Sequence, residues 1–246
     1  MNVFLNVPLD ERLVSKVQSV VPEAKVVVGV DYEDMKKYLP EAEVLLSFGF
    51  ALTDELMESA KKLKWIHAMT TGVDTFFCFD LKGRGIVLTC SRGVHSQVAE
   101  HALAFMLAFA RRFPQYYNYQ LKNQWNKLMD MDALYGKTLG IIGLGSIGQE
   151  LAARAKSFGM NVMGTKRNPT PVPNVDLVLS ADELNTMIPQ VDYLVLALPY
   201  TSDTKEILGK EQLSLMKNTA YLINVARGEV VDQDALIEAL KAKQIA

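Results

Sequence analysis

The stretch that decides the fold of this chain is Thr138-Leu-Gly-Ile-Ile-Gly143-Leu-Gly145-Ser-Ile-Gly148-Gln-Glu-Leu151. It contains an apolar run, a glycine-rich turn and the start of a helix, in that order. Gly143 permits a tight turn, Gly145 lets the backbone approach a ligand, and Gly148 lets the helix lie close to the strand. Because the unpaired N–H groups at a helix start attract anions, the pattern predicts a binding site for the pyrophosphate of a dinucleotide. The residues of this predicted site are Gly143, Leu144, Gly145, Ser146, Ile147 and Gly148.

The residues after the turn favour this interpretation over an ordinary glycine turn, which a GxGxxG string alone does not exclude. Apolar residues recur at helical spacing from Ile147 to Phe158, and Gly159 is placed to end the helix. A second apolar run then ends at Thr165. Strand, turn, helix and strand therefore follow one another as a dinucleotide-binding unit requires.

The residues after Thr165 bear on which dinucleotide is bound. About 20 residues beyond the glycines, the usual fingerprint has an acidic residue that accepts hydrogen bonds from the ribose hydroxyls. This sequence has Lys166 and Arg167 there instead. Two cations attract a 2′-phosphate, so NADP(H) is favoured and NAD(H) stays possible. The alternative is that both residues form a solvated strand end.

Length and composition limit the classes of function. A chain of 246 residues exceeds the commonest domain size and predicts two domains. A net charge of -2 gives no support for a nucleic-acid partner. The apolar segment 102–110 falls far short of the roughly 20 residues that span a bilayer, so no membrane partner is expected. The two cysteines, Cys78 and Cys90, show no disulfide or metal spacing, and no leader precedes the first apolar run. We therefore expect a cytoplasmic protein without a metal site.

Apolar runs alternate with helical patterns along the chain, which is typical of parallel α/β folds. In the first part we expect strands at 3–7, 26–30, 44–48, 65–69 and 86–89 and helices at 10–20, 31–39 and 53–60. A long helix at 96–112 follows, and the domain boundary is placed near 93–98. In the second part we expect strands at 138–142, 161–165, 193–198 and 220–225. We expect one helix at 146–158 and a second that begins with the capping-box tetrad 180–183. A third helix is expected at 235–242, with Asp232 as its N-cap.

Aromatic residues cluster between the long helix and the glycine turn, at Tyr116-Tyr-Asn-Tyr119 and Trp125. They could form an aromatic ligand surface. Packing in a core or at a subunit contact is the more usual role of such residues and is favoured here. We therefore expect a homodimer that forms through the helical region 96–135.

Several strings together resemble the D-isomer-specific 2-hydroxyacid dehydrogenase family along nearly the whole chain. Each string is modest, but their order and spacing are specific. They are Thr71-Gly-Val-Asp74, Gly93-Val-His-Ser-Gln-Val-Ala-Glu-His101, Leu139–Gly148, Val191-Asp-Tyr-Leu-Val-Leu-Ala-Leu-Pro199, Thr201-Ser-Asp-Thr204 and Ile223-Asn-Val-Ala-Arg-Gly-Glu-Val-Val-Asp232.

The resemblance implies two Rossmann-like or flavodoxin-like domains with parallel sheets. Residues 1–95 would form the substrate-binding domain and residues 96–246 the NAD(P)-binding Rossmann domain, with the active site in the cleft between them. The implied activity is the interconversion of a small 2-oxo acid and its D-2-hydroxy acid by hydride transfer, as in glyoxylate or hydroxypyruvate reductases.

The resemblance also implies roles for individual residues. The backbone N–H groups of Gly72 and Val73 would hold the substrate carboxylate, although Gly72 could equally be a turn glycine. Arg227 would bind the carboxylate and polarise the reacting carbonyl; without the resemblance it would be taken for a surface charge. The remaining cofactor contacts are Leu198, Pro199 and Thr204, with Val225 and Ala226 beside the nicotinamide.

The sequence departs from the family at the proton donor. The family supplies a histidine paired with a glutamate, and neither is present at a matching position. His67, His95 and His101 all precede the glycine turn, and structural roles are favoured for His67 and His101. The second domain lacks its last elements and the first lacks its return segment, which favours an incomplete version of a working enzyme over a natural short form. The alternative function is a catalytically silent dinucleotide-binding or dimerising module, such as a redox sensor or a corepressor-like protein.

Overall fold

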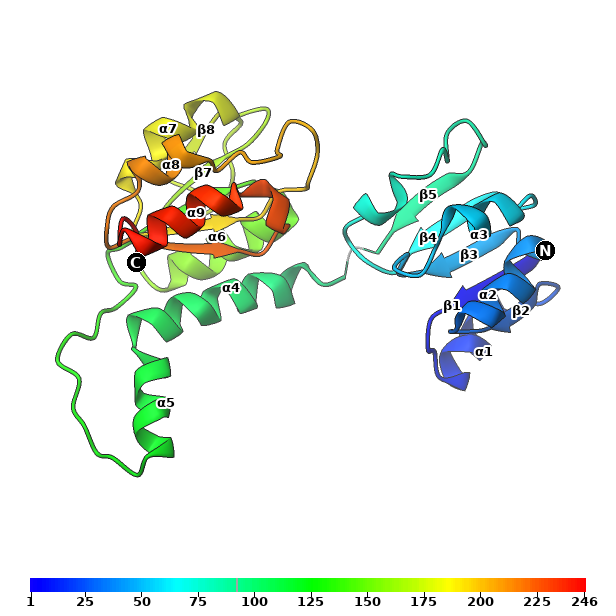
Figure 1. Ribbon diagram of the computed structural model, residues 1–246, viewed down its shortest axis with the longest axis horizontal. Coiled ribbons are helices and arrows are strands. Elements are labelled where there is room, and N and C mark those ends of the chain that lie inside the picture. The colour runs from blue at the N-terminus through cyan, green and yellow to red at the C-terminus, as the bar shows by residue number, and fades with distance from the viewer. Residues whose placement is uncertain (92) are drawn as a thin grey trace. The chain divides into compact units, whose positions relative to one another are not determined.

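The computed structural model describes residues 1–91 and 93–246, and these fall into two compact units, Met1–Gly93 and Val94–Ala246. Each unit contains one five-stranded parallel sheet with helices on both faces (Figure 1). This α/β architecture confirms the predicted fold class. Within the described residues, no helix is both long enough and apolar enough to cross a bilayer.

Unit 1 is built on the strand order β2-β1-β3-β4-β5. Its strands are β1 (Asn2–Asn6), β2 (Lys25–Val28), β3 (Val44–Ser47), β4 (Trp65–Ala68) and β5 (Val87–Cys90). Its helices are α1 (Glu11–Val20), α2 (Tyr32–Tyr38) and α3 (Asp54–Ser59), with 3-10 turns η1 (Leu39–Glu41) and η2 (Asp74–Phe76). The predicted strands and helices are confirmed to within two residues at each end.

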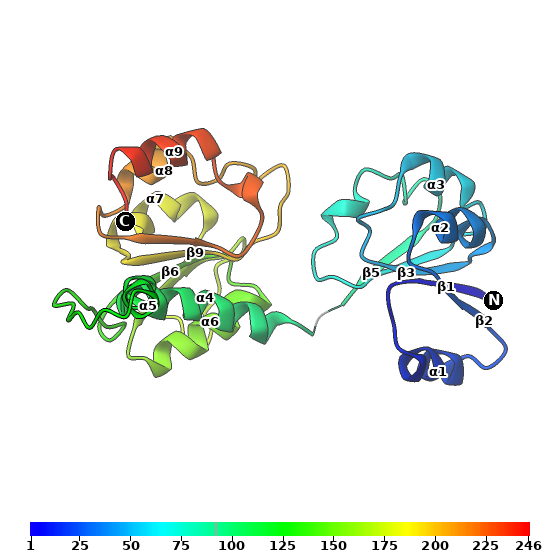
Figure 2. The ribbon, with the colours of Figure 1, turned by 60° about the horizontal axis from the view of Figure 1, so that its bottom comes forward.

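Local hydrogen bonds explain where the helices of unit 1 begin. The side chains of Asp10, Asp31 and Thr53 each accept a hydrogen bond from the backbone N–H three residues later, at 3.0, 2.8 and 3.3 Å. Such N-caps satisfy N–H groups that have no partner within the helix. The helices then cover both faces of the sheet, with α1 on one side and α2 and α3 on the other (Figure 2).

Alternating strand residues build the two hydrophobic layers of unit 1. Phe4 of β1 packs in the cluster that contains Met35 of α2 and Leu56 of α3. Its neighbours Val3 and Leu5 belong to the cluster on the opposite face. This two-residue period is what a strand buried on both faces requires.

Unit 2 is built on the strand order β10-β9-β6-β7-β8. Its strands are β6 (Thr138–Ile142), β7 (Asn161–Thr165), β8 (Leu177–Leu179), β9 (Tyr193–Leu196) and β10 (Tyr221–Asn224). Its helices are α4 (His95–Ala110), α5 (Phe113–Leu121), α6 (Ser146–Ser157), α7 (Leu184–Met187), α8 (Lys210–Leu215) and α9 (Gln233–Lys241), with 3-10 turns η3 (Ala181–Glu183), η4 (Ile188–Gln190) and η5 (Gly228–Val230). Helices α4, α5 and α6 lie on one side of the sheet and α7, α8 and α9 on the other (Figure 2).

The segment after Ser180 differs in part from the predicted helix. The capping interaction is present, since the Ser180 N–H and hydroxyl both donate to the Glu183 carboxylate, at 2.9 and 2.8 Å. The segment that follows, however, alternates between η3, α7 and η4. Pro189 cannot donate a backbone hydrogen bond and limits the regular α-helix to a single short turn.

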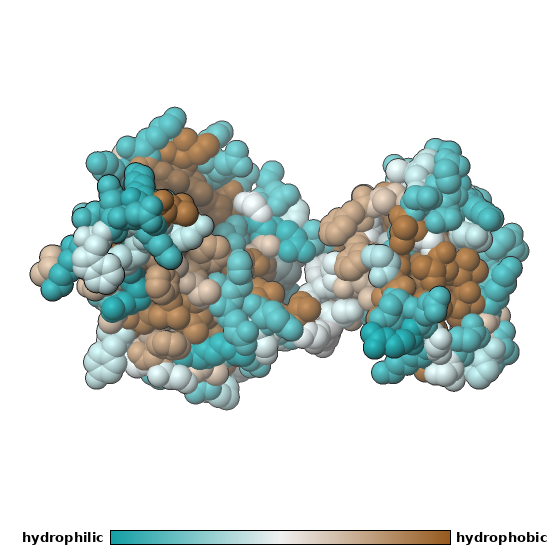
Figure 3. Space-filling model, turned by 90° about the horizontal axis from the view of Figure 1, so that it is seen from below, coloured by the Kyte–Doolittle hydropathy of each residue, from teal (hydrophilic) through white to brown (hydrophobic). Residues whose placement is uncertain are grey.

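The aromatic segment after α4 was predicted to pack in a core or at a subunit contact. The core alternative is wrong, because the segment is not buried. Helix α5, which the sequence analysis did not predict, contains no buried residue. Tyr117 is 61% exposed and the Trp125 side chain is fully exposed. Hydrophobic residues also gather on the visible face of each unit in Figure 3, among hydrophilic ones. The subunit-contact alternative for the aromatic segment stays a proposal.

A partly exposed carboxylate ties α6 to the sheet of unit 2. Asp176 accepts hydrogen bonds from the Val162 N–H at 2.8 Å and from the Lys156 ammonium at 2.9 Å. The Val162 N–H first, and then Lys156, hold the pKa of the Asp176 carboxyl below its ordinary value of 3.8. Because the pKa is lower in the folded state, the stabilisation is present above the unfolded-state pKa and is lost as the pH falls through the folded-state pKa.

We therefore expect Asp176→Asn to lower the melting temperature at pH 7 by about 2 °C or less, since the pair is solvent-screened. The difference from the parent protein should shrink as the pH falls from 7 to below the ordinary pKa of 3.8, towards the lowered pKa of the folded state. Thermal melts of both proteins at the two pH values measure this, with Asp203→Asn as a surface control. An equal difference at both pH values would rule out the charged form as the stabilising species.

Candidate functional site

The glycine turn after β6 has the geometry that its sequence predicts. The backbone N–H groups of Gly143 and Leu144 donate to the Thr165 carbonyl at the end of β7, at 3.3 and 3.0 Å. Gly143 has a φ of +104°, in the region that favours glycine, and a Cβ on it would lie 2.6 Å from the Ala197 carbonyl oxygen. A side chain at this position is therefore excluded both by backbone conformation and by lack of room.

The other two glycines of the turn have opposite surroundings. A Cβ on Gly148 would collide with the Gly143 carbonyl and lie 3.1 Å from a methyl group of Ile141, so α6 sits directly on β6. A Cβ on Gly145 would meet nothing within 4 Å. Gly145 is also the N-cap of α6, where no side-chain oxygen caps the helix. Open space beside an uncapped helix start fits a bound pyrophosphate.

Two cations stand at the carboxyl end of β7, the strand next to β6. The Lys166 N–H donates to the Leu179 carbonyl at 3.0 Å, and its ammonium reaches the Thr170 hydroxyl at 3.3 Å. Arg167 is exposed. No acidic residue occurs between positions 160 and 175. The local charge at this strand end is thus positive.

The loop after β9 is held against the glycine turn. The Thr204 hydroxyl donates to the Pro199 carbonyl at 2.7 Å and accepts from the Thr201 N–H at 2.8 Å. The Leu198 Cβ lies 2.9 Å from the position that a Cβ on Gly143 would occupy. The predicted residues Leu198, Pro199 and Thr204 therefore belong to one fastened loop beside the turn.

The loop after β10 is shaped by Asn224, a residue that the sequence analysis missed. The Asn224 side-chain oxygen accepts from the Ala226 N–H at 2.9 Å, and its amide donates to the Arg227 carbonyl at 2.7 Å. This is an Asx-type turn, and an asparagine at a strand end is its sequence signal. Arg227 is half-buried, and its guanidinium donates to the Ala226 carbonyl at 2.9 Å. The turn fixes the backbone that carries the arginine.

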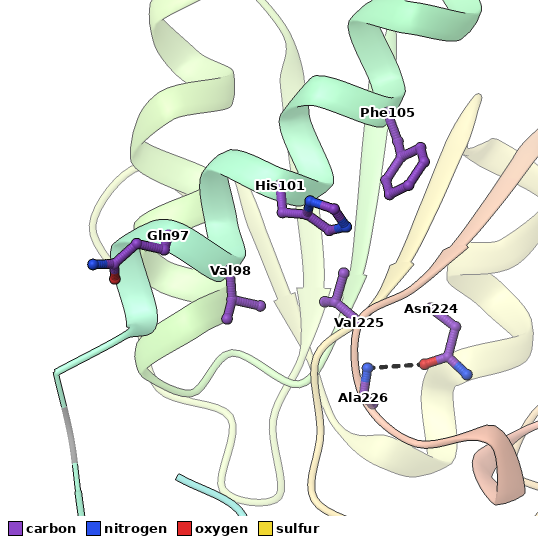
Figure 4. Close-up of a pocket in the computed structure, with 7 residues that line it drawn as sticks. All are labelled: Gln97, Val98, His101, Phe105, Asn224, Val225 and Ala226. Carbon is purple, nitrogen blue, oxygen red and sulfur yellow. Dashed lines mark hydrogen bonds between the residues drawn. The ribbon is translucent and has the colours of Figure 1, made fainter. Parts of the chain in front are cut away.

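A pocket of about 530 Å³ opens between α4 and this loop. Figure 4 shows His101 and Phe105 extending from α4 toward Val225. The two α4 rings lie edge to face with centroids 4.7 Å apart. His101 is exposed, which differs from the structural role predicted for it. The lining residues are Gln97, Val98, His101, Phe105, Asn224, Val225 and Ala226.

The predicted carboxylate-binding residues of unit 1 lie in the loop between β4 and η2. The Thr70 hydroxyl donates to the Gly72 carbonyl, and the Phe76 N–H donates to the Val73 carbonyl at 3.0 Å. Both carbonyls are thus engaged within the loop, and Gly72 and Val73 are half-buried. His67 of β4 is hydrogen-bonded to Thr89 at 2.9 Å and to Ser91 at 3.2 Å, as a structural histidine would be.

Comparisons with known proteins agree with these features. A family model described as D-isomer specific 2-hydroxyacid dehydrogenase, NAD binding domain, matches residues 103–246. The chain is 36% identical over its whole length to a D-3-phosphoglycerate dehydrogenase of Methanocaldococcus jannaschii and covers 47% of that protein. It is 39% identical, over 78% of its length, to a glyoxylate reductase of Thermococcus litoralis, of which it covers 61%. The chain thus spans about half the length of the curated relatives it matches.

A solved structure extends the likeness to the fold. A D-isomer specific 2-hydroxyacid dehydrogenase family protein from Aeromonas salmonicida superposes with a TM-score of 0.89 at 28% identity. The match covers 99% of this chain and 78% of that one. The similarity therefore includes both units of the chain.

Proposed function

The chain belongs to the D-isomer-specific 2-hydroxyacid dehydrogenase family, and from this membership we propose that its protein interconverts a small 2-oxo acid and the D-2-hydroxy acid by hydride transfer. The observation that carries the proposal is the turn at 143–148, where Gly143 is forced to be glycine and Gly145 leaves open space at a helix start. When bound, a nicotinamide dinucleotide supplies or accepts the hydride. On this proposal, residues 1–95 form the substrate-binding domain and residues 96–246 the NAD(P)-binding domain.

The activity is tested by adding glyoxylate or hydroxypyruvate to the protein with NADPH and following the loss of NADPH absorbance. We expect oxidation that depends on both the protein and the 2-oxo acid in protein that carries the family's histidine and glutamate pair, which residues 1–246 lack at matching positions. Binding of NADPH by such protein without turnover of any 2-oxo acid would contradict the enzyme proposal. That result would support the catalytically silent dinucleotide-binding module instead.

We propose that the cofactor contacts follow the carboxyl ends of the strands of unit 2, where ligands of open α/β sheets bind. The pyrophosphate binds at the turn 143–148, and the adenosine ribose lies near Thr165. The loop with Leu198, Pro199 and Thr204 lines the site, and the Asn224 turn presents Val225 and Ala226 to the nicotinamide. Support comes from the hydrogen bonds that the Gly143 and Leu144 N–H groups donate to the Thr165 carbonyl, and from the close packing of Leu198 against Gly143.

For the substrate we propose two recognition elements. The N–H groups of Gly72 and Val73 bind the carboxylate, since exposed amides in a loop form anion-binding concavities. The planar guanidinium of Arg227 binds the acid and polarises the carbonyl that receives hydride. The Asn224 turn supports this role because it fixes the backbone at Arg227.

Lys166 and Arg167 support a preference for NADP(H). The two cations attract a 2′-phosphate, and because both side chains are donors only they offer no acceptor for a 2′-hydroxyl. We expect the double variant Lys166→Ala, Arg167→Ala to raise the Kd for NADPH at least about tenfold and to change that for NADH less than about twofold. Fluorescence titrations measure both, with Lys210→Ala, Lys241→Ala as a control of equal charge change. Equal losses for the two cofactors would refute the preference.

We also propose that a second copy of the chain packs on the region 96–135. Exposed apolar residues are concentrated in one part of this region, and large patches of this kind mark interaction sites. They are Phe113, Tyr117, Leu121 and Trp125. We expect a dimer in sedimentation equilibrium and a shift toward monomer for Tyr117→Asp. A monomer at every concentration of the parent protein would contradict this proposal.

A further inference from the structure

Two exposed phenylalanines stand at the carboxyl end of β3 in unit 1. Phe48 is 38% exposed and Phe50 is 79% exposed. Their rings are stacked, with centroids 6.2 Å apart and an interplanar angle of 4°. The pair exposes apolar ring surface to water, and such a surface gains free energy when an apolar group covers it.

The residue between them explains why both rings point away from the core. Gly49 is buried and has a φ of +85°, and a Cβ on it would lie 2.8 Å from both the Phe76 ring and the Thr75 hydroxyl. The Gly49 N–H donates to the Ser47 hydroxyl at 3.0 Å, which donates in turn to Asn6 of β1 at 3.0 Å. Gly49 is therefore packed against the core and hydrogen-bonded to the sheet, and this fixes the backbone that carries Phe48 and Phe50.

The pair lies next to the loop that is proposed to bind the carboxylate. Strands β3 and β4 are paired in parallel, and the Met69 N–H continues the pairing with a bond of 2.9 Å to the Ser47 carbonyl. Gly49 packs against Thr75 and Phe76, and the Phe76 N–H is bonded to the Val73 carbonyl. The aromatic pair and the Gly72-Val73 amides thus lie in adjacent loops at the carboxyl end of the sheet.

We propose that Phe48 and Phe50 receive the side chain of the 2-oxo acid and select an aromatic or large apolar side chain. This inference rests on the proposed function, because it assigns the substrate class of that site. An aromatic side chain on the pair gains buried apolar area and ring contacts, whereas the methyl of pyruvate gains little and the hydrogen of glyoxylate gains nothing. A difference in affinity of at least about tenfold follows between substrates that share the same 2-oxo acid group.

The test is calorimetric titration of the protein with phenylpyruvate and with pyruvate, in the presence of saturating NADP⁺, which cannot reduce them. We expect phenylpyruvate to bind at least about tenfold more tightly than pyruvate. Phe50→Ala should remove most of this difference, Phe50→Tyr should keep it, and pyruvate affinity should change less than twofold in either. Phe158→Ala, which removes an exposed ring from unit 2, is the control and should change neither affinity.

The outcomes separate the two levels of the proposal. Equal affinities for the two acids in the parent protein, or an unchanged preference in both Phe48→Ala and Phe50→Ala, would overturn the specificity inference and leave the proposed function intact. If protein that has bound NADP⁺ binds neither of these acids, nor glyoxylate or hydroxypyruvate, the proposed function itself is overturned, and the inference with it. Because both rings are exposed, melting temperatures of the variants should stay close to that of the parent and confirm that they fold.

Discussion

Gly145→Val should weaken cofactor binding by about a hundredfold or more while leaving the fold intact. The reason is the open space beside this residue, where a Cβ meets nothing within 4 Å. The added side chain then occupies only the volume into which the pyrophosphate is proposed to come, at the uncapped start of α6. A hundredfold loss corresponds to about 2.7 kcal/mol of binding free energy, comparable with the loss of one or two charge-assisted hydrogen bonds. Calorimetric titration with NADPH measures the affinity, and a thermal melt checks the fold.

Gly209→Val is the matched control for this substitution. Gly209 is also the N-cap of a helix in unit 2, with an extended backbone and a nearest contact of 3.5 Å for an added Cβ. It should bind NADPH as the parent protein does. Gly148→Ala should instead lower the melting temperature, because its Cβ collides with backbone. Parent-like affinity in folded Gly145→Val would place the cofactor away from the turn.

Arg227→Lys should lower kcat/KM for 2-oxo acid reduction by about a hundred- to a thousandfold. The substitution keeps the positive charge but loses the planar fork that can engage two oxygens at once. Removing one donor that stabilises developing charge costs this much in known cases. NADPH affinity should change little, since Arg227 is proposed to contact the substrate. Steady-state kinetics and a cofactor titration measure the two effects.

The control for the arginine is Arg12→Lys, a substitution at an exposed residue of α1 whose partner is Asp10. Its kinetic constants should match those of the parent protein. If Arg227→Lys retains full kcat/KM, the guanidinium is not the group that binds and polarises the substrate. A loss confined to NADPH affinity would indicate that Arg227 contacts the cofactor and not the substrate.

The parts of the fold that the sequence predicts are those in which apolar residues repeat at a clear period, or in which the backbone adopts a conformation that favours glycine. The strand at 138–142 and the helix after it follow from apolar spacing, and Gly143 follows from a turn that no other residue adopts easily. The prediction of Asp232 as an N-cap is confirmed, since its carboxylate accepts from the Ala235 N–H at 3.0 Å. Each of these signals is local, so it can be read without knowing the tertiary structure.

The features that escaped prediction depend on contacts between distant segments or on very short elements. Strand β8 has three residues, too few to show a period, and it is defined by its pairing with β7. The outward position of Phe48 and Phe50 follows from the packing of Gly49 against Thr75 and Phe76, which no sequence pattern reveals. The aromatic residues of α5 look like core in the sequence, yet none of them is buried. Burial depends on the neighbours, and these are set by the fold.

Calorimetric titration of the folded parent protein with NADPH and NADH tests whether the turn at 143–148 binds a nicotinamide dinucleotide. The structure of the turn at 143–148 predicts saturable binding of one dinucleotide per chain, with NADPH the tighter ligand. If neither coenzyme gives a heat change or protects the protein against thermal unfolding, the proposal that the turn at 143–148 binds a nicotinamide dinucleotide is contradicted.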